Sequence, residues 1–216
     1  MGMKQILVVM AAVVLVGVGC GKPSPAVTIA NPIIEESVRE SLEKPKGKLT
    51  KADLGKVKWL ILEKNQITDK DLKEVAKMQK LKRLQLDATK ITDAGLKEVA
   101  KWQQLNMLGL KKTQITDAGL KEVAKLQKLT SLHLDDTKIT DACLKEVAKL
   151  QKLKFLNLSG TNITDAGLKE VAKLRQLEFL GVDGTKVTKL GVAKLSKALP
   201  GCSIRYGPRP PPRMGL

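Results

Sequence analysis

Residues 89–101 read TKITDAGLKEVAK, and almost the same thirteen letters return three more times at intervals of 24 residues. The ITD core of this stretch starts at Ile67, recurs with that period up to residues 163–165, and ends in a degenerate copy, VTK, at residues 187–189. A unit of this size cannot bury both of its faces by itself. The fixed period therefore predicts a stack in which each unit covers the next.

The letters before each copy predict a short strand. In LKRLQLDAT, residues 81–89, Leu84 and Leu86 alternate with polar residues, which is typical of a strand with one buried face. Thr89 follows where the chain leaves the strand, and its hydroxyl can satisfy backbone groups in that turn.

The letters of the copy itself predict a helix. Thr92 lies where a helix N-cap belongs, and Asp93 complements the positive end of that helix. Leu96 and Val99 follow at helical spacing and form one apolar stripe. Gly95 stands where the helix and the neighbouring coil must approach closely. Each unit is therefore expected to contain a strand, a turn and a helix.

Aligned with one another, the units follow the pattern LxxLxLxxTxITDAGLKEVAK. This pattern resembles the leucine-rich repeat family over residues 57–206, and the TDAGLKE lettering is similar to ribonuclease-inhibitor-like and bacterial repeats. The resemblance implies an α/β solenoid with a short curved parallel sheet inside and helices outside. The chain departs from the family where a Thr, such as Thr89, replaces the usual Asn or Cys.

Other segments flank the repeats on either side. Residues 31–44, NPIIEESVRESLEK, place Ile34, Val38 and Leu42 on one helical face, which suits a helix covering the first unit. At the other end, Ile204 and Tyr206 are expected at the two buried positions of a last strand. We predict a signal peptide at 1–20, a Pro-rich linker at 21–31, an N-terminal cap at 32–56, six repeats plus a terminal strand at 57–206, and a disordered basic tail at 207–216.

The first twenty residues have the features of an export signal. Lys4 supplies a positive start, and residues 6–18 form an apolar run that is short for a bilayer span. The GVGC end resembles the lipobox of bacterial lipoproteins, which implies lipidation at Cys20, although Gly17 stands where that motif usually has Leu. Ordinary secretion and an uncleaved anchor are the alternatives. We expect an exported protein of the cell envelope, held to a membrane by a lipid on Cys20.

The outward-pointing strand positions differ from unit to unit, whereas the rest of the repeat is nearly constant. We predict non-catalytic binding of a protein or peptide on the concave strand face, because these positions carry side-chain types that anchor protein interfaces. The predicted contact residues are Trp59, Arg83, Met107, His133, Asp135, Phe155, Asn157 and Phe179. Phe155 and Phe179 lie in adjacent units and should touch.

The net charge of +17 is expected away from the strand face. That face has four cationic and five anionic side chains: Lys64, Arg83, Lys111, Lys112, Glu63, Asp87, Asp135, Asp136 and Asp183. The helices carry much of the excess, in Lys97, Lys101, Lys121, Lys125, Lys145, Lys149, Lys169 and Lys173. The alternative function is an electrostatic or structural role in which this Lys-rich convex face binds anionic lipid or polymer. Otherwise these lysines are a solvated face.

Signals for catalysis and for cofactors are weak. His133, Asp135, Asp136 and Ser159 include the residue types of a hydrolytic site, but all four occupy variable positions on an open face. The sequence has no phosphate-binding loop, no Cys-x-x-Cys and no His pair for a metal. We expect no enzyme activity, no cofactor and no metal site, and a monomer that does not bind nucleic acid.

The two cysteines inside the repeat region are predicted to remain free thiols. Cys143 replaces the packing Gly of its unit and should be buried. Cys202 lies more than two units further along the chain, which is beyond disulfide reach at about 5 Å per stacked strand.

Overall fold

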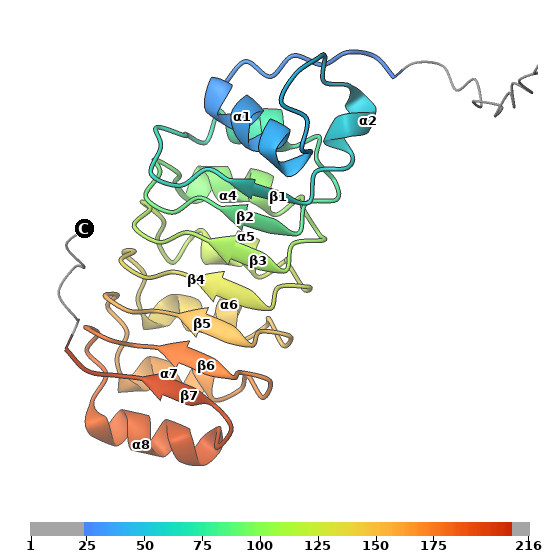
Figure 1. The fold of residues 1–216 in the computed structure, drawn as a ribbon. Helices are drawn as coiled ribbons and strands as arrows, with labels where there is room; N and C mark the ends of the chain where they lie inside the picture. The colour runs from blue at the N-terminus through green and yellow to red at the C-terminus, as the bar shows by residue number, and fades with distance from the viewer. Residues whose placement is uncertain (1–23, 209–216) are drawn as a thin grey trace, which may run out of the picture.

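The computed structural model describes residues 24–208 and contains one sheet of seven parallel strands in the order β1 to β7 (Figure 1). The predicted signal peptide with Cys20, and the tail beyond Pro208, lie outside the described residues. The strands are β1 (Trp59–Ile61), β2 (Arg83–Gln85), β3 (Met107–Gly109), β4 (Ser131–His133), β5 (Phe155–Asn157), β6 (Phe179–Gly181) and β7 (Ser203–Arg205). The helices are α1 (Pro32–Ser41), α2 (Lys51–Leu54), α3 (Leu72–Val75), α4 (Asp93–Val99), α5 (Leu120–Val123), the 3₁₀ turn η1 (Asp141–Cys143), α6 (Leu144–Val147), α7 (Asp165–Val171) and α8 (Lys189–Ala198).

The 24-residue period sets the register of the sheet. Leu60 pairs with Leu84 and Leu84 with Leu108, so each residue lies beside its equivalent in the next repeat. The same register continues to the last strand, where Leu180 pairs with Ile204. The α/β solenoid with a parallel sheet is thus confirmed.

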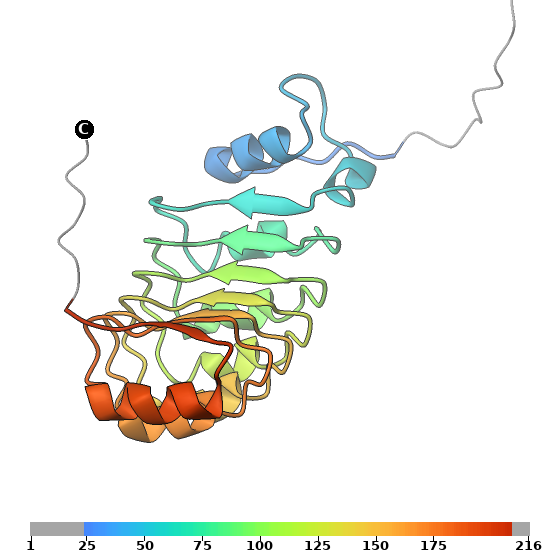
Figure 2. The same cartoon turned by 60° about the horizontal axis from the view of Figure 1, so that its bottom comes forward.

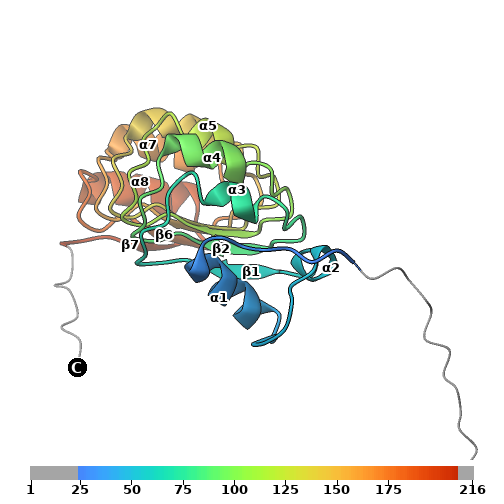
Figure 3. The same cartoon turned by 90° about the horizontal axis from the view of Figure 1, so that it is seen from above.

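The sheet lies on one side of the stack and the helices α3 to α8 lie on the other (Figure 3). Neighbouring strands lie about 4.8 Å apart, whereas packed helices need about 8–10 Å between their axes. A stack built from both must therefore curve, with the strands on its inner side.

The core runs between these two layers. It consists of aliphatic side chains at repeat-equivalent positions, such as Leu132 and Leu134 from the strand segment and Leu144 and Val147 from the helix, all 1% exposed or less. Trp102 is fully buried where the other repeats have Met or Leu. Its indole N–H has no hydrogen-bond partner, which makes it a polar group held inside the core by packing alone.

The threonine that follows each of the strands β2 to β6 closes the turn, as the sequence predicted. The Thr89 hydroxyl donates to the carbonyl of Leu86 at 2.6 Å, and Thr113 donates to Leu110 at the same distance. Because the three-residue link is local, each repeat satisfies this buried carbonyl without help from its neighbours.

The Asp of each ITD core has a second role besides the one expected. Asp93 lies in the first turn of α4, where we predicted that it would complement the positive end of the helix. Its carboxylate also accepts from the backbone N–H of Thr116 at 2.8 Å and from the Thr116 hydroxyl at 2.6 Å, in the next repeat. The same pair of bonds recurs from Asp69 to Asp165, so these aspartates link consecutive repeats.

This Asp–Thr link explains why most repeats have a glycine two residues after their own Asp. The glycine leaves room for the Asp carboxylate of the preceding repeat. A Cβ added to Gly119 would lie 2.4 Å from Oδ1 of Asp93, and at Gly167 it would lie 2.2 Å from Oδ1 of Asp141. Cys143 occupies the equivalent position, is 1% exposed, and is a free thiol, as predicted. Burial raises the pKa of Cys143 far above its ordinary value, with a smaller contribution from Asp117.

The N-terminal cap covers the first strand. Helix α1 lies against β1 (Figures 1 and 2) and buries Ile34 and Val38 completely. The buried Ser37 hydroxyl accepts from the backbone N–H of Ile61 at 3.0 Å, which satisfies the edge of the sheet. No earlier repeat supplies an Asp to the first unit, and Asp71 instead accepts from Thr68 N at 2.8 Å.

The cap begins earlier in the chain than predicted. Residues 21–31 were expected to form a linker, yet Val27 N donates to Leu49 O at 2.8 Å and Ile29 is only 6% exposed. Ala30 N donates to the Glu74 carboxylate at 2.8 Å. The part of this segment that the structure describes is therefore packed against the cap and the first repeat.

The opposite end of the sheet is less covered. Ile204 is only partly buried and Tyr206 is 42% exposed, although both were expected in the core. Within residues 24–208, strand β7 pairs with β6 on one side and with no strand on the other, so its inward side chains have fewer packing neighbours than those of the inner strands. Among residues 24–208, no helix is long and apolar enough to span a bilayer.

Candidate functional site

The variable side chains form columns across the outward face of the sheet. The strand pairing aligns the first column in the order Trp59, Arg83, Met107, Ser131, Phe155 and Phe179. Arg83 is exposed and the others are half-buried. Together with the next outward positions, this face is called the strand face below. Its residues come from different repeats, so only stacking brings them together.

An aromatic stack occupies the C-terminal half of the strand face. The rings of Phe155 and Phe179 lie with centroids 4.4 Å apart and planes 8° from parallel. The predicted contact between them is therefore present. His133 lies against Phe155, with ring centroids 4.9 Å apart and planes tilted by 31°.

Arg205 extends this stack by one strand and was not predicted as a site residue. Its guanidinium carbon lies 5.6 Å from the Phe179 ring centroid, within the range of a cation–π contact. The signal was present in the sequence, since Arg205 stands 24 residues after Gly181 in an outward column. We call His133, Phe155, Phe179 and Arg205 the ring stack.

A polar network lies beside the ring stack. The Asp135 carboxylate contacts Lys111 Nζ at 3.0 Å and accepts from Asn157 Nδ2 at 3.0 Å. Asn157 Oδ1 in turn accepts from the Ser159 hydroxyl at 2.8 Å. Asp135 is only 3% exposed, so it supports the face from beneath. The structure therefore does not present Asp135 as the contact residue we predicted.

The network continues to the last strand. Arg205 pairs with Asp183 through Nε and donates from its terminal nitrogen to the Ser159 hydroxyl at 3.4 Å. Ser159 also donates to Asp183 at 3.3 Å. Asp183 is 5% exposed, whereas the Arg205 side chain is 54% exposed. These bonds fix the guanidinium at the end of the ring stack.

Two glycines make room for the network. A Cβ on Gly181 would lie 2.4 Å from Asn157 Oδ1, and one on Gly109 would lie 2.7 Å from Asp87 Oδ1. In both places the polar side chain of the preceding repeat bends across the glycine. These two glycines are therefore part of the site, although they carry no side chain.

Burial shifts the titration of two groups on this face. It lowers the pKa of His133 below its ordinary value, against the opposing pull of Asp135 and Asp87. It also raises the pKa of Asp87, although a hydrogen bond from Lys111 N at 2.9 Å favours the carboxylate. His133 is therefore neutral at pH 7, and the ring stack carries one charge, on Arg205.

The face that a partner meets is more positive than the sequence count suggested. Asp135 and Asp183 are buried beneath Lys111 and Arg205, whose side chains are 43% and 54% exposed. Lys64, Lys112 and Asp136 were counted on the strands but lie in the following turns, at φ values of 53° to 59°. At Lys111 and Arg205 the strand face therefore exposes the cation and buries its acidic partner, whereas Glu63 and Asp87 stay partly exposed.

The structure does not bring the hydrolytic residue types together as a Ser159–His133 pair. Ser159 bonds to Asn157 and Asp183, whereas the His133 Nε2 atom lies 3.2 Å from the hydroxyl of Ser131. Within residues 24–208, no group of three His, Cys, Asp or Glu side chains is arranged to hold a metal ion.

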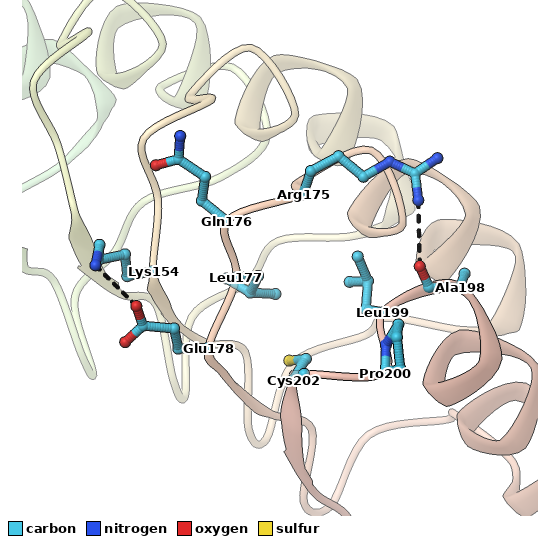
Figure 4. Close-up of a pocket in the computed structure, with 10 residues that line it drawn as sticks. Lys154, Arg175, Gln176, Leu177, Glu178, Ala198, Leu199, Pro200 and Cys202 are labelled. Atoms are coloured by element: carbon cyan, nitrogen blue, oxygen red, sulfur yellow. Dashed lines mark hydrogen bonds and ion pairs between the residues drawn. The ribbon is translucent and has the colours of Figure 1, made fainter.

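A cavity of about 580 Å³ lies beside the last repeat, away from the strand face (Figure 4). Its cations already have partners, since Arg175 donates to Ala198 O at 3.2 Å and Lys154 pairs with Glu178 at 2.8 Å. Burial raises the pKa of the Cys202 thiol, which also lines the cavity. The strand face is the stronger candidate, because it carries the side chains that vary most between repeats and the aromatic stack.

The convex lysines fall into two sets. Lys101, Lys125, Lys149 and Lys173 pair with the glutamate three residues earlier at 2.7–2.8 Å. Lys97, Lys121, Lys145 and Lys169 are exposed, and in the described part of the chain they have no ion-pair partner. About half of the lysines predicted for this face are therefore neutralised locally.

Comparison with known proteins agrees with this geometry. The family described as "Leucine Rich repeat" matches residues 77–100, 125–148 and 149–172. The crystal structure of internalin C2 from Listeria monocytogenes is similar to this chain, with a TM-score of 0.61 and 24% identity over 81% of this chain and 82% of that one. The fold is a leucine-rich repeat solenoid. A second Listeria monocytogenes internalin, inlF, gives a TM-score of 0.57 and 18% identity over 82% of this chain, which spans 55% of inlF.

None of the curated proteins matches the chain. The solenoid fold and the three matching repeats nevertheless support a general use, since leucine-rich repeat scaffolds commonly mediate protein binding. In this solenoid the constant positions hold the stack together, and the strand face carries the variation.

Proposed function

We propose that this solenoid binds a protein or peptide on its concave strand face and does no chemistry on it. The observation that carries the proposal is the ring stack, in which four flat side chains from the successive strands β4 to β7 contact one another in sequence. Aromatic and Arg side chains dominate the binding energy of protein interfaces. The other predicted contact residues, Trp59, Arg83 and Met107, continue the same face toward the N-terminal cap.

The test is a pair of substitutions, Phe155→Asp with Phe179→Asp. Both rings are half-buried on the outside of the sheet, so the fold is retained, and two carboxylates replace the apolar centre of the surface. We expect capture of the native partner, measured by crosslinking in cells and mass spectrometry, to be lost. Capture at the wild-type level would show that the strand face is not the binding site.

The matched control places the same charge change on the opposite face. Ala142→Asp with Ala166→Asp alters two exposed positions in the helical layer. Both lie in the first turn of a helix, where a carboxylate is favourable. This variant should capture the partner normally, and both variants should unfold cooperatively in urea.

The alternative function is electrostatic binding of anionic lipid or polymer by the convex lysines. The observation that favours it is the row of exposed lysines without ion-pair partners in the described structure, Lys97, Lys121, Lys145 and Lys169. Salt screens the attraction between exposed charges, so the affinity should fall steeply between about 50 and 300 mM salt. Binding that is retained at the higher salt and lost with the Phe pair would exclude the electrostatic role.

We further propose an envelope location with a lipid on Cys20, and a ribonuclease-inhibitor-like type of repeat. The GVGC ending and the TDAGLKE lettering support these two proposals. Cys20→Ala should move the protein from the membrane fraction to the soluble fraction of cells. A protein that stays in the membrane fraction through an intact leader would point to an uncleaved anchor.

A further inference from the structure

We propose that copies of this chain associate head to tail, with the acidic face of helix α1 in one copy covering the open end of the sheet in the next. The acidic face consists of Glu36, Glu40 and Glu43, and the open end consists of β7 and α8. Figure 1 shows these two surfaces at opposite ends of the stack. The inference goes beyond the proposed function, because it leaves the strand face free, and it departs from the monomer that we expected from the sequence.

The edge of β7 has backbone groups with no strand to pair with in residues 24–208. Val182 N donates to Arg205 O at 2.9 Å, from the end of β6 to β7. Tyr206 stands 24 residues after Val182, so its own N–H is directed to the side on which β7 has no neighbour. The first edge of the sheet is closed, since Ser37 of α1 accepts from Ile61 N at 3.0 Å. An open strand edge is a template for pairing with another chain.

Helix α8 differs from the helices of the other repeats at positions near this end. Lys189 replaces the aspartate that bonds to the following repeat, and Leu190 replaces an exposed alanine. Leu190 and Tyr206 are 62% and 42% exposed, and they are two of the three large apolar side chains that residues 24–208 expose. Residues 186–208 contain five basic residues and no acidic one: Lys186, Lys189, Lys194, Lys197 and Arg205. The open end is therefore both basic and apolar.

The nearest acidic groups do not neutralise the open end. Asp183 is buried and pairs with Arg205. Asp165 is held by hydrogen bonds to the last repeat and attracts Lys194. The cations of α8 that have no ion-pair partner in the described part of the chain are Lys189 and Lys197.

The acidic face lies on the side of α1 that the core does not use. Ile34 and Val38 are buried against β1, whereas Glu36, Glu40 and Glu43 are exposed and have no ion-pair partner among the described residues. A groove of about 550 Å³ runs beside these glutamates, and its other lining residues are Pro32, Glu35, Arg39 and Pro45.

The cations nearest to the acidic face have their own partners or lie outside it. Arg39 pairs with Glu35 at 2.8 Å, and Lys44 pairs with an aspartate of α2 at 2.8 Å. Lys46 and Lys48 are exposed in the loop that follows the helix. The negative surface is therefore the helix face and not the N-terminal cap as a whole.

The two surfaces match in charge, in hydrogen bonding and in apolar contact. Carboxylates of the acidic face can accept from the ammonium groups of α8 and from the free N–H groups of β7. The groove on α1 has room for the exposed side chain of Leu190. Pairing of two open ends is disfavoured, because it would bring their cations together. A contact between different ends is heterologous, so it continues from copy to copy as a linear chain.

The first experiment measures the association of the purified full-length protein by sedimentation velocity. We expect the weight-average mass of the wild type to rise with protein concentration at about 50 mM salt and to fall toward that of a single chain at about 300 mM. Glu36→Lys with Glu40→Lys, and separately Lys189→Glu with Lys197→Glu, should each weaken association at least about tenfold, because exposed attractive pairs become repulsive. A wild type that stays a single chain at every concentration would overturn the inference.

A mixture of the two reversed variants tests which surfaces meet. Each variant alone carries like charges at its two ends, so its copies repel one another. In the mixture every contact between the two variants again joins opposite charges. Equal amounts of the two should therefore associate as the wild type does. Loss of association in both variants without recovery in the mixture would contradict head-to-tail pairing.

Leu190→Ala tests the apolar part of the contact. The fold accepts this change, because alanine stands at the equivalent exposed position of other repeats, such as Ala166. We expect association to weaken at least about threefold, because less apolar surface is buried. The control is Lys97→Glu with Lys121→Glu, which makes the same charge change as the α8 variant in the middle of the convex face and should leave association unchanged.

The strand-face variant separates this contact from the proposed binding site. Phe155→Asp with Phe179→Asp should associate as the wild type does. Association that depends on these two residues, or on Lys97 and Lys121, would place the contact between copies elsewhere and overturn the inference.

Discussion

At the scale of the residue, the constant letters of the repeat are explained by contacts between repeats. Asp93, Thr116 and Gly119 form one arrangement in which the carboxylate bridges two donors of Thr116 and fills the space where a Gly119 side chain would be. The three letters therefore act together across two repeats, and the triplet with Cys143 in place of the glycine keeps both bonds from Thr140 to Asp117.

The glycine of this arrangement can be tested directly. Gly119→Ala would place a Cβ 2.4 Å from Asp93 Oδ1 and 2.6 Å from a methyl of Leu96. We expect a loss of about 1–3 kcal/mol in the free energy of unfolding, measured by urea denaturation. Gly201→Ala is the control, since its Cβ would meet nothing within 4 Å. Equal stability of the two variants would show that the Asp–Thr link yields to a side chain.

His133 gives the strand face a pH dependence. Burial holds its pKa below its ordinary value, so the unfolded chain binds the proton more readily than the folded one. The folded state therefore loses stability as pH falls below about 6.5, the ordinary His value, and regains it above. Urea midpoints between pH 7.5 and 5 should fall more for the wild type than for His133→Gln. A parallel decline in both proteins would contradict this assignment.

At the scale of the element, single strands and helices have no independent stability. Each strand has three residues and several helices have four, which is well below the length at which an isolated helix forms. Their stability comes from the core between the layers and from the partners at each end. The N-terminal end is closed by α1, which takes the place of an earlier repeat.

Ser37 is the residue through which α1 closes the sheet edge. Ser37→Ala removes the acceptor for the Ile61 backbone N–H in a buried place. We expect a loss of about 1–2 kcal/mol and faster hydrogen exchange in β1 than in the wild type. Ser196→Ala on the exposed surface of α8 should change stability by less than about 0.5 kcal/mol. Unchanged exchange in β1 would mean that water replaces the lost acceptor.

At the scale of the whole molecule, stability is a sum over neighbouring repeats, so it depends on position along the stack. Leu132 on β4 has a repeat on each side and is fully buried, whereas Ile204 occupies the same position on β7 and is only partly buried. Leu132→Ala should cost about 2–5 kcal/mol. Ile204→Ala should cost about 1 kcal/mol, because its site is open on one side. Equal losses in urea denaturation would argue against a stack with an open end.

The burial of side chains across the whole molecule also decides the charge that the strand face presents to a partner. Residue counting makes the strand face nearly neutral, but the carboxylates of Asp135 and Asp183 are buried and the cations above them are exposed. Desolvated acids held by Lys111 and Arg205 stabilise the face and leave positive groups for a partner. A count of charged residues in the repeat sequence therefore does not give the charge that a partner meets, unless the burial of each residue is known.

Much of the solenoid followed from the sequence alone. The 24-residue period predicted the strand register, the alternating leucines predicted the buried strand positions, and Thr89 was expected to close its turn, as it does. These features could be predicted because they depend on spacing within one repeat or on the equivalence of repeats. The touching pair Phe155 and Phe179 was predictable for the same reason.

Only the tertiary structure decided which partner each polar side chain takes. Asp93 bonds to Thr116 in the next repeat, Arg205 completes the ring stack, and Asp135 is buried. The physical reason is that a short polar side chain in a stack has donors at similar distance in its own repeat and in the next. The spacing of the sequence determines that the two repeats are adjacent. The burial and the orientation of the polar side chain, which packing sets, determine which donor it reaches.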